Sequence, residues 1–454
     1  MELELSLSLS STGNVAALVL SRLAAHPLAA CGTAPAFVDA ATGESLSFLA
    51  LRRAALSLAA GLRLGLGLRR GDAVLVLSRS NSLLLPQILL GVLAAGGVVV
   101  AADPDATPAE IAAAAHGSGA VMIVAAPEEA GKVAGVGVPL LLTSRPQMDA
   151  HRALLSAEEL IDGGDPTALQ PASEPTTMEP SMADDLAFLA YYYSSSEKAS
   201  SRRTAAGATM THADLVAAVA RAGCLPPDEE EGRRVCLASL PMCSAHGLPL
   251  IALGLPAAGV TTVLVPPPSE SESDPRVTRD AVAAHGATDV VATPEAAAAL
   301  LAAAGGPMAT ALACNKLATL RRVIVAPTPF SPETREEFRR RLPWVRLMEM
   351  EEPALEQAQE LGRALMLKQA AAAVIQYNSQ TTEQMLATTN EATSPVRPLK
   401  KVQNNILGNI LSRSTMSKIL RKQPIALHQI FDNFLQRHMV RFSNAMMEYT
   451  LEYS

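Results

Sequence analysis

The sequence predicts an α/β protein whose strands form mostly parallel sheets, and two observations support this. Hydrophobic residues make up 49% of the 454 residues and charged residues only 18%, which allows a large core and excludes a largely disordered chain. Short apolar runs also alternate along the chain with helical segments of about ten to fifteen residues. This alternation is typical of βαβ units, in which helices connect parallel strands.

The first alternating region covers residues 33–130. A helix is expected to start at Pro108, because proline and an acid such as Glu110 are favoured in a first helical turn. Residues 98–101 are continuously apolar, as in a strand that is buried on both faces. The other expected strands are 36–39, 73–77 and 121–125, and the other expected helices are 48–62 and 86–95.

The α/β pattern resumes after residues 163–183, which are rich in Pro, Ser and Thr and are interpreted as a linker-like loop. Strands are expected at 186–193, 235–240, 261–265 and 320–325, and helices at 213–222, 294–304 and 334–341. The composition changes near residue 350: residues 1–350 contain six Asn and Gln, whereas residues 351–454 contain seventeen. We therefore expect one large domain over 1–350 and a reduced, helix-rich C-terminal segment over 351–454.

Charge and cysteine usage exclude several classes of protein. With 37 Lys and Arg against 44 Asp and Glu, the net charge is -7, which argues against a nucleic-acid or anionic-membrane binder. The five cysteines form no CxxC pair, so neither a zinc site nor a disulfide framework is expected. Residues 83–102 carry no charge, but Pro86 and the pair Gly96-Gly97 interrupt them, which favours a buried helix and strand over a membrane span.

The two ends of the chain carry no recognisable targeting signal. The first ten residues lack the basic and apolar regions of a secretory signal, and the last four, LEYS, are not a peroxisomal tripeptide. We expect a cytoplasmic monomer.

The first candidate site is the loop that follows the strand 186–193. It contains Ser194, Ser195, Ser196, Glu197 and Lys198 and precedes the Thr-His dipeptide at 211–212. Hydroxyl groups, backbone N–H groups and a cation after a strand can hold a polyphosphate. The alternative is a solvated polar loop, because no glycine occurs there before position 207 to allow a close approach of backbone to phosphate.

The second candidate site is the segment 240–248, in which His246 and Gly247 follow an apolar strand. A histidine beside a glycine at a strand end is able to face a cleft, although a single histidine in such a place is more often structural. No group of residues in the chain has the spacing of metal ligands.

Read in order, these segments resemble the adenylate-forming (AMP-binding) ligases, specifically plant 4-coumarate–CoA ligase-like proteins. The resemblance covers roughly residues 35–348 and is carried by PAFVD at 35–39, GDAV at 71–74, LGVLAAG at 90–96, ADP at 102–104 and TPAEI at 107–111. The segment 240–248 is similar to the family motif P-M-F-H-x-[YF]-G, with Ser244 at the usual histidine position and His246 at the aromatic one.

The resemblance implies an ANL-type large domain and a two-step reaction. ATP and a carboxylic acid, here a hydroxycinnamate or a fatty-acid-like acid, first form an acyl-adenylate with Mg²⁺, and CoA then displaces AMP. The resemblance further implies that residues 194–198 contact phosphate and that His246 and Gly247 bind the acyl part of the substrate. It also implies that Lys418 is the catalytic lysine of the adenylation step. Lys418 lies in KILRK at 418–422, sixteen residues after KKV at 400–402, which is the family's spacing; a chance match in a basic helix is the alternative.

The chain departs from the family pattern where the nucleotide would bind. Residues 196–199 (SEKA) replace the usual G-T-T-G run, and no G-Y-G-x-T-E follows Leu347. A carboxylate such as Glu197 opposes a triphosphate at close range. We therefore expect a large domain that is incomplete on its C-terminal side and a ligase activity that is weak or lost, which leaves it open whether the chain is an enzyme. The alternatives are a non-catalytic pseudoenzyme that binds an acid and a damaged gene product without function.

Overall fold

The computed structural model of the chain describes residues 14–25, 34–78, 81–103, 105–146, 154–169, 185–193, 205–223, 234–265, 275–303, 317–326 and 330–350. All of them belong to the first of the two units into which the chain divides, Met1–Ala370 and Ala371–Ser454. The predicted C-terminal segment 351–454 and most of the predicted linker, from residue 170 onward, lie outside the described residues.

One sheet of the described part has the strand order β13-β12-β11-β9-β10-β1-β2. All its neighbouring strands are parallel except the pair β1 and β2. The strands are β1 (Pro35–Asp39), β2 (Ser45–Ser47), β9 (Val235–Ala238), β10 (Thr261–Leu264), β11 (Asp289–Ala292), β12 (Arg322–Val325) and β13 (Arg346–Glu349).

The second sheet has the order β6-β5-β3-β4-β7-β8 and is parallel except for the hairpin of β7 and β8. Its strands are β3 (Ala73–Leu77), β4 (Val98–Ala101), β5 (Ala120–Ala125), β6 (Leu140–Leu142), β7 (Leu186–Tyr193) and β8 (Ala205–Thr211). Every residue of β3 and β4 is buried, as expected for strands covered on both faces.

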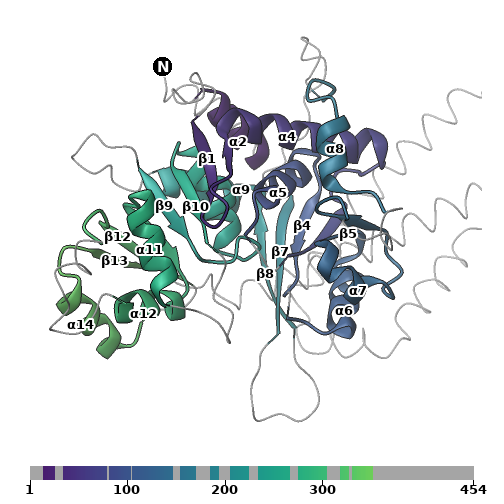
Figure 1. Cartoon of the computed structure of the whole chain (residues 1–454). Helices are drawn as coiled ribbons and strands as arrows, with labels where there is room; N and C mark the ends of the chain where they lie inside the picture. The colour runs from purple at the N-terminus through teal and green to yellow at the C-terminus, as the bar shows by residue number, and fades with distance from the viewer. Residues whose placement is uncertain are drawn as a thin grey trace, which may run out of the picture. The chain divides into compact units, whose positions relative to one another are not determined.

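Helices cover both faces of the two sheets (Figure 1). They are α2 (Val15–Ala25), α4 (Phe48–Ala60), α5 (Leu84–Ala94), α6 (Pro108–Ser118), α7 (Ala130–Val133), α8 (Ala157–Gly163), α9 (His212–Gly223), α10 (Leu255–Ala257), α11 (Pro275–His285), α12 (Pro294–Ala303) and α14 (Pro332–Arg341). Two π-helical turns, η1 (Gly61–Gly65) and η4 (Leu248–Gly254), and the 3-10 turn η2 (Pro127–Glu129) complete the described elements.

Local sequence explains where several helices begin. Helix α6 starts with a capping box, in which the Thr107 hydroxyl accepts the Glu110 N–H and the Glu110 carboxylate accepts the Thr107 N–H. Ser156 and Glu159 form the same arrangement at the start of α8. These caps satisfy backbone N–H groups that have no partner within the helix.

The core consists of three clusters. The largest contains one face of each sheet together with α2, α4, α5 and α9, so both sheets share this helical layer. The second joins the other face of β9, β11 and β12 to α11, α12 and α14, and the third joins the other face of β3, β4 and β5 to α6 and α7. In β3, for example, Val74 and Val76 belong to the shared cluster while Leu75 belongs to the third.

The predicted α/β fold with mostly parallel strands is confirmed. The uncharged stretch 83–102 forms the buried helix α5 and the strand β4, as the sequence suggests. Among the described residues, no helix is both long enough and apolar enough to cross a membrane.

Candidate functional site

The carboxyl ends of strands in the two sheets meet at Asn81, which follows β3. Its amide nitrogen Nδ2 donates to the carbonyl of Leu240 at 2.9 Å, and its oxygen Oδ1 accepts the N–H of Met242 at 2.9 Å. Leu240 and Met242 lie in the segment that follows β9 in the other sheet. We refer to these two hydrogen bonds of Asn81 as the joint at Asn81. Ligands of open α/β sheets bind outside the carboxyl ends of strands, so the joint at Asn81 lies at the edge where a site is expected.

The segment after β9 is folded into a tight turn that ends at Gly247. The Ser244 hydroxyl donates to the carbonyl of Pro241 at 2.7 Å and accepts the Gly247 N–H at 2.9 Å. A Cβ atom at position 247 would lie 2.0 Å from the Pro241 carbonyl oxygen, a distance that excludes any side chain. Gly247 is therefore required by the turn, and Ser244 is used to close it.

His246 lies inside this turn and is 7% exposed. Its carbonyl accepts the N–H of Leu250 at 3.2 Å, which begins the helical turn η4. Cys243 keeps some exposed surface, but packing around its thiol raises the pKa to about 12, so the thiol stays protonated and is no nucleophile at neutral pH. The turn places His246 and Gly247 in a largely apolar setting, and their predicted role on the acyl side stays a prediction.

The predicted phosphate loop is carried by the hairpin of β7 and β8. The last residue of β7, Tyr193, pairs with Ala205, the first of β8. The residues 194–204 that connect them, including Ser194, Ser195, Ser196, Glu197 and Lys198, lie outside the described residues, as does Lys418. The structure therefore places the strands that bear the loop but does not test the roles of these six residues.

The Thr-His dipeptide at the junction of β8 and α9 forms the expected helix start. The Thr211 hydroxyl accepts the Asp214 N–H, and the Asp214 carboxylate accepts the Thr211 N–H at 2.9 Å. His212 is 1% exposed, and its Nδ1 accepts the N–H of Val15, the first residue of α2, at 3.4 Å. Burial lowers the pKa of His212, the positive charge of Arg70 adds to this effect, and Asp185 opposes it. His212 is thus a neutral packing residue rather than a proton carrier.

The resemblance implies Mg²⁺ as a partner of ATP, but the sequence predicts no residues to hold it. No group of three or more His, Cys, Asp or Glu side chains there is arranged to hold a metal ion. Glu349, at the carboxyl end of β13, already accepts hydrogen bonds from the Arg335 guanidinium at 2.7 Å and the Phe330 N–H at 2.9 Å. We derive no step through a metal.

A groove also exists at the opposite edge of the second sheet, near the amino ends of β3, β5 and β6. It is lined by Leu66, Gly67, Leu68, Asp72, Val121, Met122, Pro139, Leu140, Leu141 and Leu155. Because ligands of parallel sheets bind at carboxyl ends, this apolar groove is not the candidate site.

Solved structures define the class of fold. The chain is similar to an acyl-CoA synthetase from Brucella canis with a TM-score of 0.57 and 20% sequence identity, covering 74% of this chain and 56% of that one. At this identity the likeness shows the shared fold alone. The fold is that of acyl-CoA synthetases.

The AMP-binding enzyme family matches residues 25–350, and the chain belongs to this family of adenylate-forming ligases. Curated plant relatives agree. "4-coumarate--CoA ligase-like 3" from Oryza sativa subsp. japonica is 33% identical over 263 residues, covering 55% of this chain and 42% of the relative. "Probable CoA ligase CCL5" from Humulus lupulus is 27% identical over 318 residues, covering 69% and 53%. The chain spans about half the length of the curated relatives it matches.

Sequence reasoning missed the role of Asn81. An asparagine in a loop is usually a turn residue, and nothing in the pattern indicates a bond to residues 159 and 161 positions away. The only available signal is that a polar residue stands between two strongly apolar segments.

Proposed function

We propose that this chain acts as a 4-coumarate–CoA ligase-like protein that binds a carboxylic acid and ATP for acyl-adenylate formation, with weak or no turnover. The reaction would join the acid to CoA through the adenylate. The observation that best supports the proposal is the joint at Asn81, because it sets the turn 240–247 against the end of β3 in the sheet that carries the β7–β8 hairpin.

Sheet geometry gives this joint its significance. Strands β3, β4 and β7 are neighbours, so the end of β7 lies two inter-strand spacings, about 10 Å, from the end of β3. An acid held beside the turn and a phosphate held by the hairpin loop are then within reach of each other. Holding two reactants in this way accounts for much of the rate enhancement in such condensations.

In this proposal the acid packs against His246 and Gly247, and Ser194, Ser195, Ser196 and Lys198 contact phosphate. Lys418 supplies the cation for adenylation. CoA then accepts the acyl group from the acyl-adenylate. The acid is a hydroxycinnamate or a fatty-acid-like carboxylate, since the turn is largely apolar. The hydroxyl-rich loop with Glu197 in place of a glycine-rich one motivates the weak turnover.

Acid-dependent release of pyrophosphate tests the proposal. The full chain is incubated with ATP, Mg²⁺ and a panel of cinnamates and fatty acids, and product acyl-CoA is measured after CoA is added. We expect slow or undetectable turnover that rises when residues 196–199 are replaced by the family's Gly-Thr-Thr-Gly. Robust turnover by the unaltered chain would contradict the expected loss of activity while supporting the ligase assignment.

The second candidate function is a pseudoenzyme that binds an acid without using ATP. It is favoured by the contrast between the ordered turn at 240–247 and the altered loop sequence at 196–199. Thermal stabilisation by a carboxylic acid but not by ATP would support this candidate, whereas stabilisation by both supports the ligase. A variant His246→Ala serves as the control, because it should weaken the effect of the acid and leave that of ATP unchanged.

A further inference from the structure

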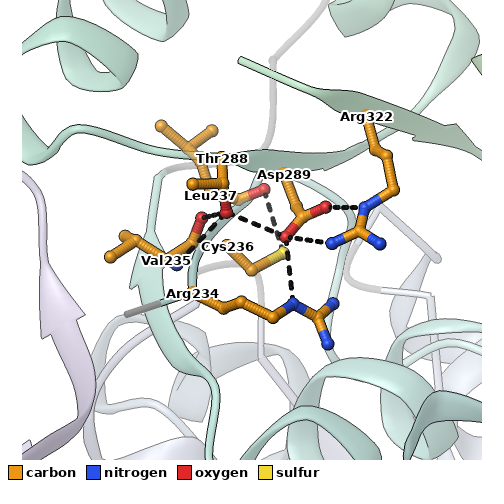
Figure 2. Close-up of polar contacts among 7 residues, drawn as sticks. All are labelled: Arg234, Val235, Cys236, Leu237, Thr288, Asp289 and Arg322. Carbon is orange, nitrogen blue, oxygen red and sulfur yellow. Dashed lines mark hydrogen bonds and ion pairs between the residues drawn. The ribbon is translucent and has the colours of Figure 1, made fainter. Parts of the chain in front are cut away.

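The amino ends of β9, β11 and β12 carry a charged cluster on the sheet edge opposite to the candidate site. Asp289 begins β11 and is 1% exposed, and Arg322 begins β12 and is 3% exposed. Arg234 precedes β9 and joins the same cluster (Figure 2). We refer to Arg234, Asp289 and Arg322 as the arginine cluster.

The single carboxylate of the arginine cluster is engaged mainly by Arg322. Arg322 binds both of its oxygens, with Nε on Oδ1 and Nη2 on Oδ2 at 3.2 Å. The Thr288 hydroxyl lies 3.0 Å from Oδ2 as well. Asp289 therefore accepts three hydrogen bonds, and none of them comes from Arg234.

Arg234 is the residue left without an adequate partner. Its Nε lies 3.6 Å from Oδ2 of Asp289, beyond hydrogen-bond distance, and its terminal nitrogens extend past the carboxylate (Figure 2). In the described part of the chain, Nε and Nη2 of Arg234 are buried and have no hydrogen-bond acceptor. A buried charged donor without an acceptor is costly, so such a group is a strong attractor for an anion.

The surrounding charge favours an anion further. Arg346, the first residue of β13, pairs in register with Arg322, which pairs with Asp289. Residues in register on neighbouring parallel strands point to the same face, so three arginines share one face with one carboxylate. Within the described part of the chain, these four side chains together carry a charge of +2.

We propose that Arg234 binds a tetrahedral oxyanion, such as inorganic phosphate, at this edge. The guanidinium presents paired N–H groups that match two oxygens of such an anion. The side chain of Arg234 is 18% exposed while its Nε and Nη2 are buried, so the anion has to displace neighbouring groups to reach these two donors. The site is separate from the candidate active site, because it lies at the amino rather than the carboxyl ends of the strands.

Phosphate titrations of the full chain test the proposal, read by the thermal unfolding midpoint and by ³¹P line broadening at constant ionic strength with chloride as reference. We expect saturable stabilisation by phosphate, weakened at least about tenfold by Arg234→Gln. The matched control is Arg321→Gln, which removes the same charge from an exposed residue directly before β12. It should leave the affinity unchanged.

A further variant keeps the test decisive. Arg234→Lys retains the charge without the paired donors and should bind phosphate more weakly than the unaltered chain but more tightly than Arg234→Gln. Unchanged affinity in a folded Arg234→Gln variant, or no saturable effect of phosphate on the unaltered chain, would overturn the proposal.

Discussion

The two ends of strand β9 are organised by different kinds of interaction. At its carboxyl end, Asn81 and Ser244 hold the turn 240–247 through hydrogen bonds between uncharged groups. At its amino end, Asp289 and Arg322 form an ion pair that is almost completely buried. Uncharged hydrogen bonds therefore fix the backbone at the end that bears the candidate site, whereas a buried ion pair organises the other end.

The largest effect is expected at the charged end. Asp289→Ala leaves two arginines buried without their carboxylate and should lower the free energy of unfolding by about 3–5 kcal/mol. Urea unfolding followed by circular dichroism measures this change. The double variant Asp289→Leu with Arg322→Met replaces the buried pair by apolar side chains and should recover the part of the loss that comes from Arg322, while Arg234 still lacks the carboxylate. A double variant as unstable as the single one would show that the pair itself, rather than the unpaired charge, stabilises this edge.

The uncharged end should respond less strongly. Asn81→Leu leaves the Leu240 carbonyl and the Met242 N–H without their partner, at about 1–3 kcal/mol for each buried group. We expect a loss of about 2–4 kcal/mol in the same unfolding assay, together with weaker stabilisation by carboxylic acids. Ser82→Ala is the matched control next in sequence and should change stability by less than about 0.5 kcal/mol. Suppose that Asn81→Leu leaves both the free energy of unfolding and the stabilisation by carboxylic acids unaltered. The hydrogen bonds of Asn81 would then not hold the two sheet edges together.

The third prediction concerns pH and His212, which lies at the start of α9. In the unfolded chain His212 gains its proton as the pH falls through about 6.5, but burial lowers the pKa in the folded protein. Between the two pKa values the unfolded state binds more protons, so stability is fully present above pH 6.5 and falls as the pH decreases below it. Protonation would also remove the acceptor for the Val15 N–H.

Unfolding free energies measured between pH 5 and 8 check this dependence. His212→Gln, which cannot titrate, should flatten the slope below pH 6.5, whereas His116→Gln at an exposed position should leave it unchanged. Arg70→Gln removes a charge that lowers the pKa of His212 and should therefore reduce the slope. An unaltered slope in His212→Gln would assign the pH dependence to another group.

The same contrast explains how much the sequence could predict. The buried strands β3, β4 and β10 were predicted because every residue in them is apolar or β-branched, a pattern that local sequence carries. The short edge strands β2 and β6 were missed, because three residues hold too little pattern and pairing with a neighbour decides their conformation. The start of α9 was predicted from its Thr-His dipeptide, since capping is local.

The candidate site was only partly predictable for the same physical reason. His246 and Gly247 stood out beside a predicted strand end, and both lie in the turn 240–247, but their role at the acyl side stays a prediction. Partners more than 30 residues away in sequence make three other residues important: Asn81, Asp289 and Arg322. A single polar residue beside an apolar strand does not reveal such a partner. Long-range pairs of this kind were therefore beyond reach of pattern and spacing.

The smallest effect is expected for an ion pair that is exposed. Arg145 lies 3.6 Å from Glu158 and also contacts Asp162, but its side chain is 50% exposed, compared with 2% for Asp289. Water and salt screen such pairs, and the cost of ordering two long side chains offsets much of the attraction. Arg145→Gln should leave the thermal midpoint within experimental error at physiological salt. A loss as large as that of Asn81→Leu would show that surface charge, and not burial, governs the stability of this fold.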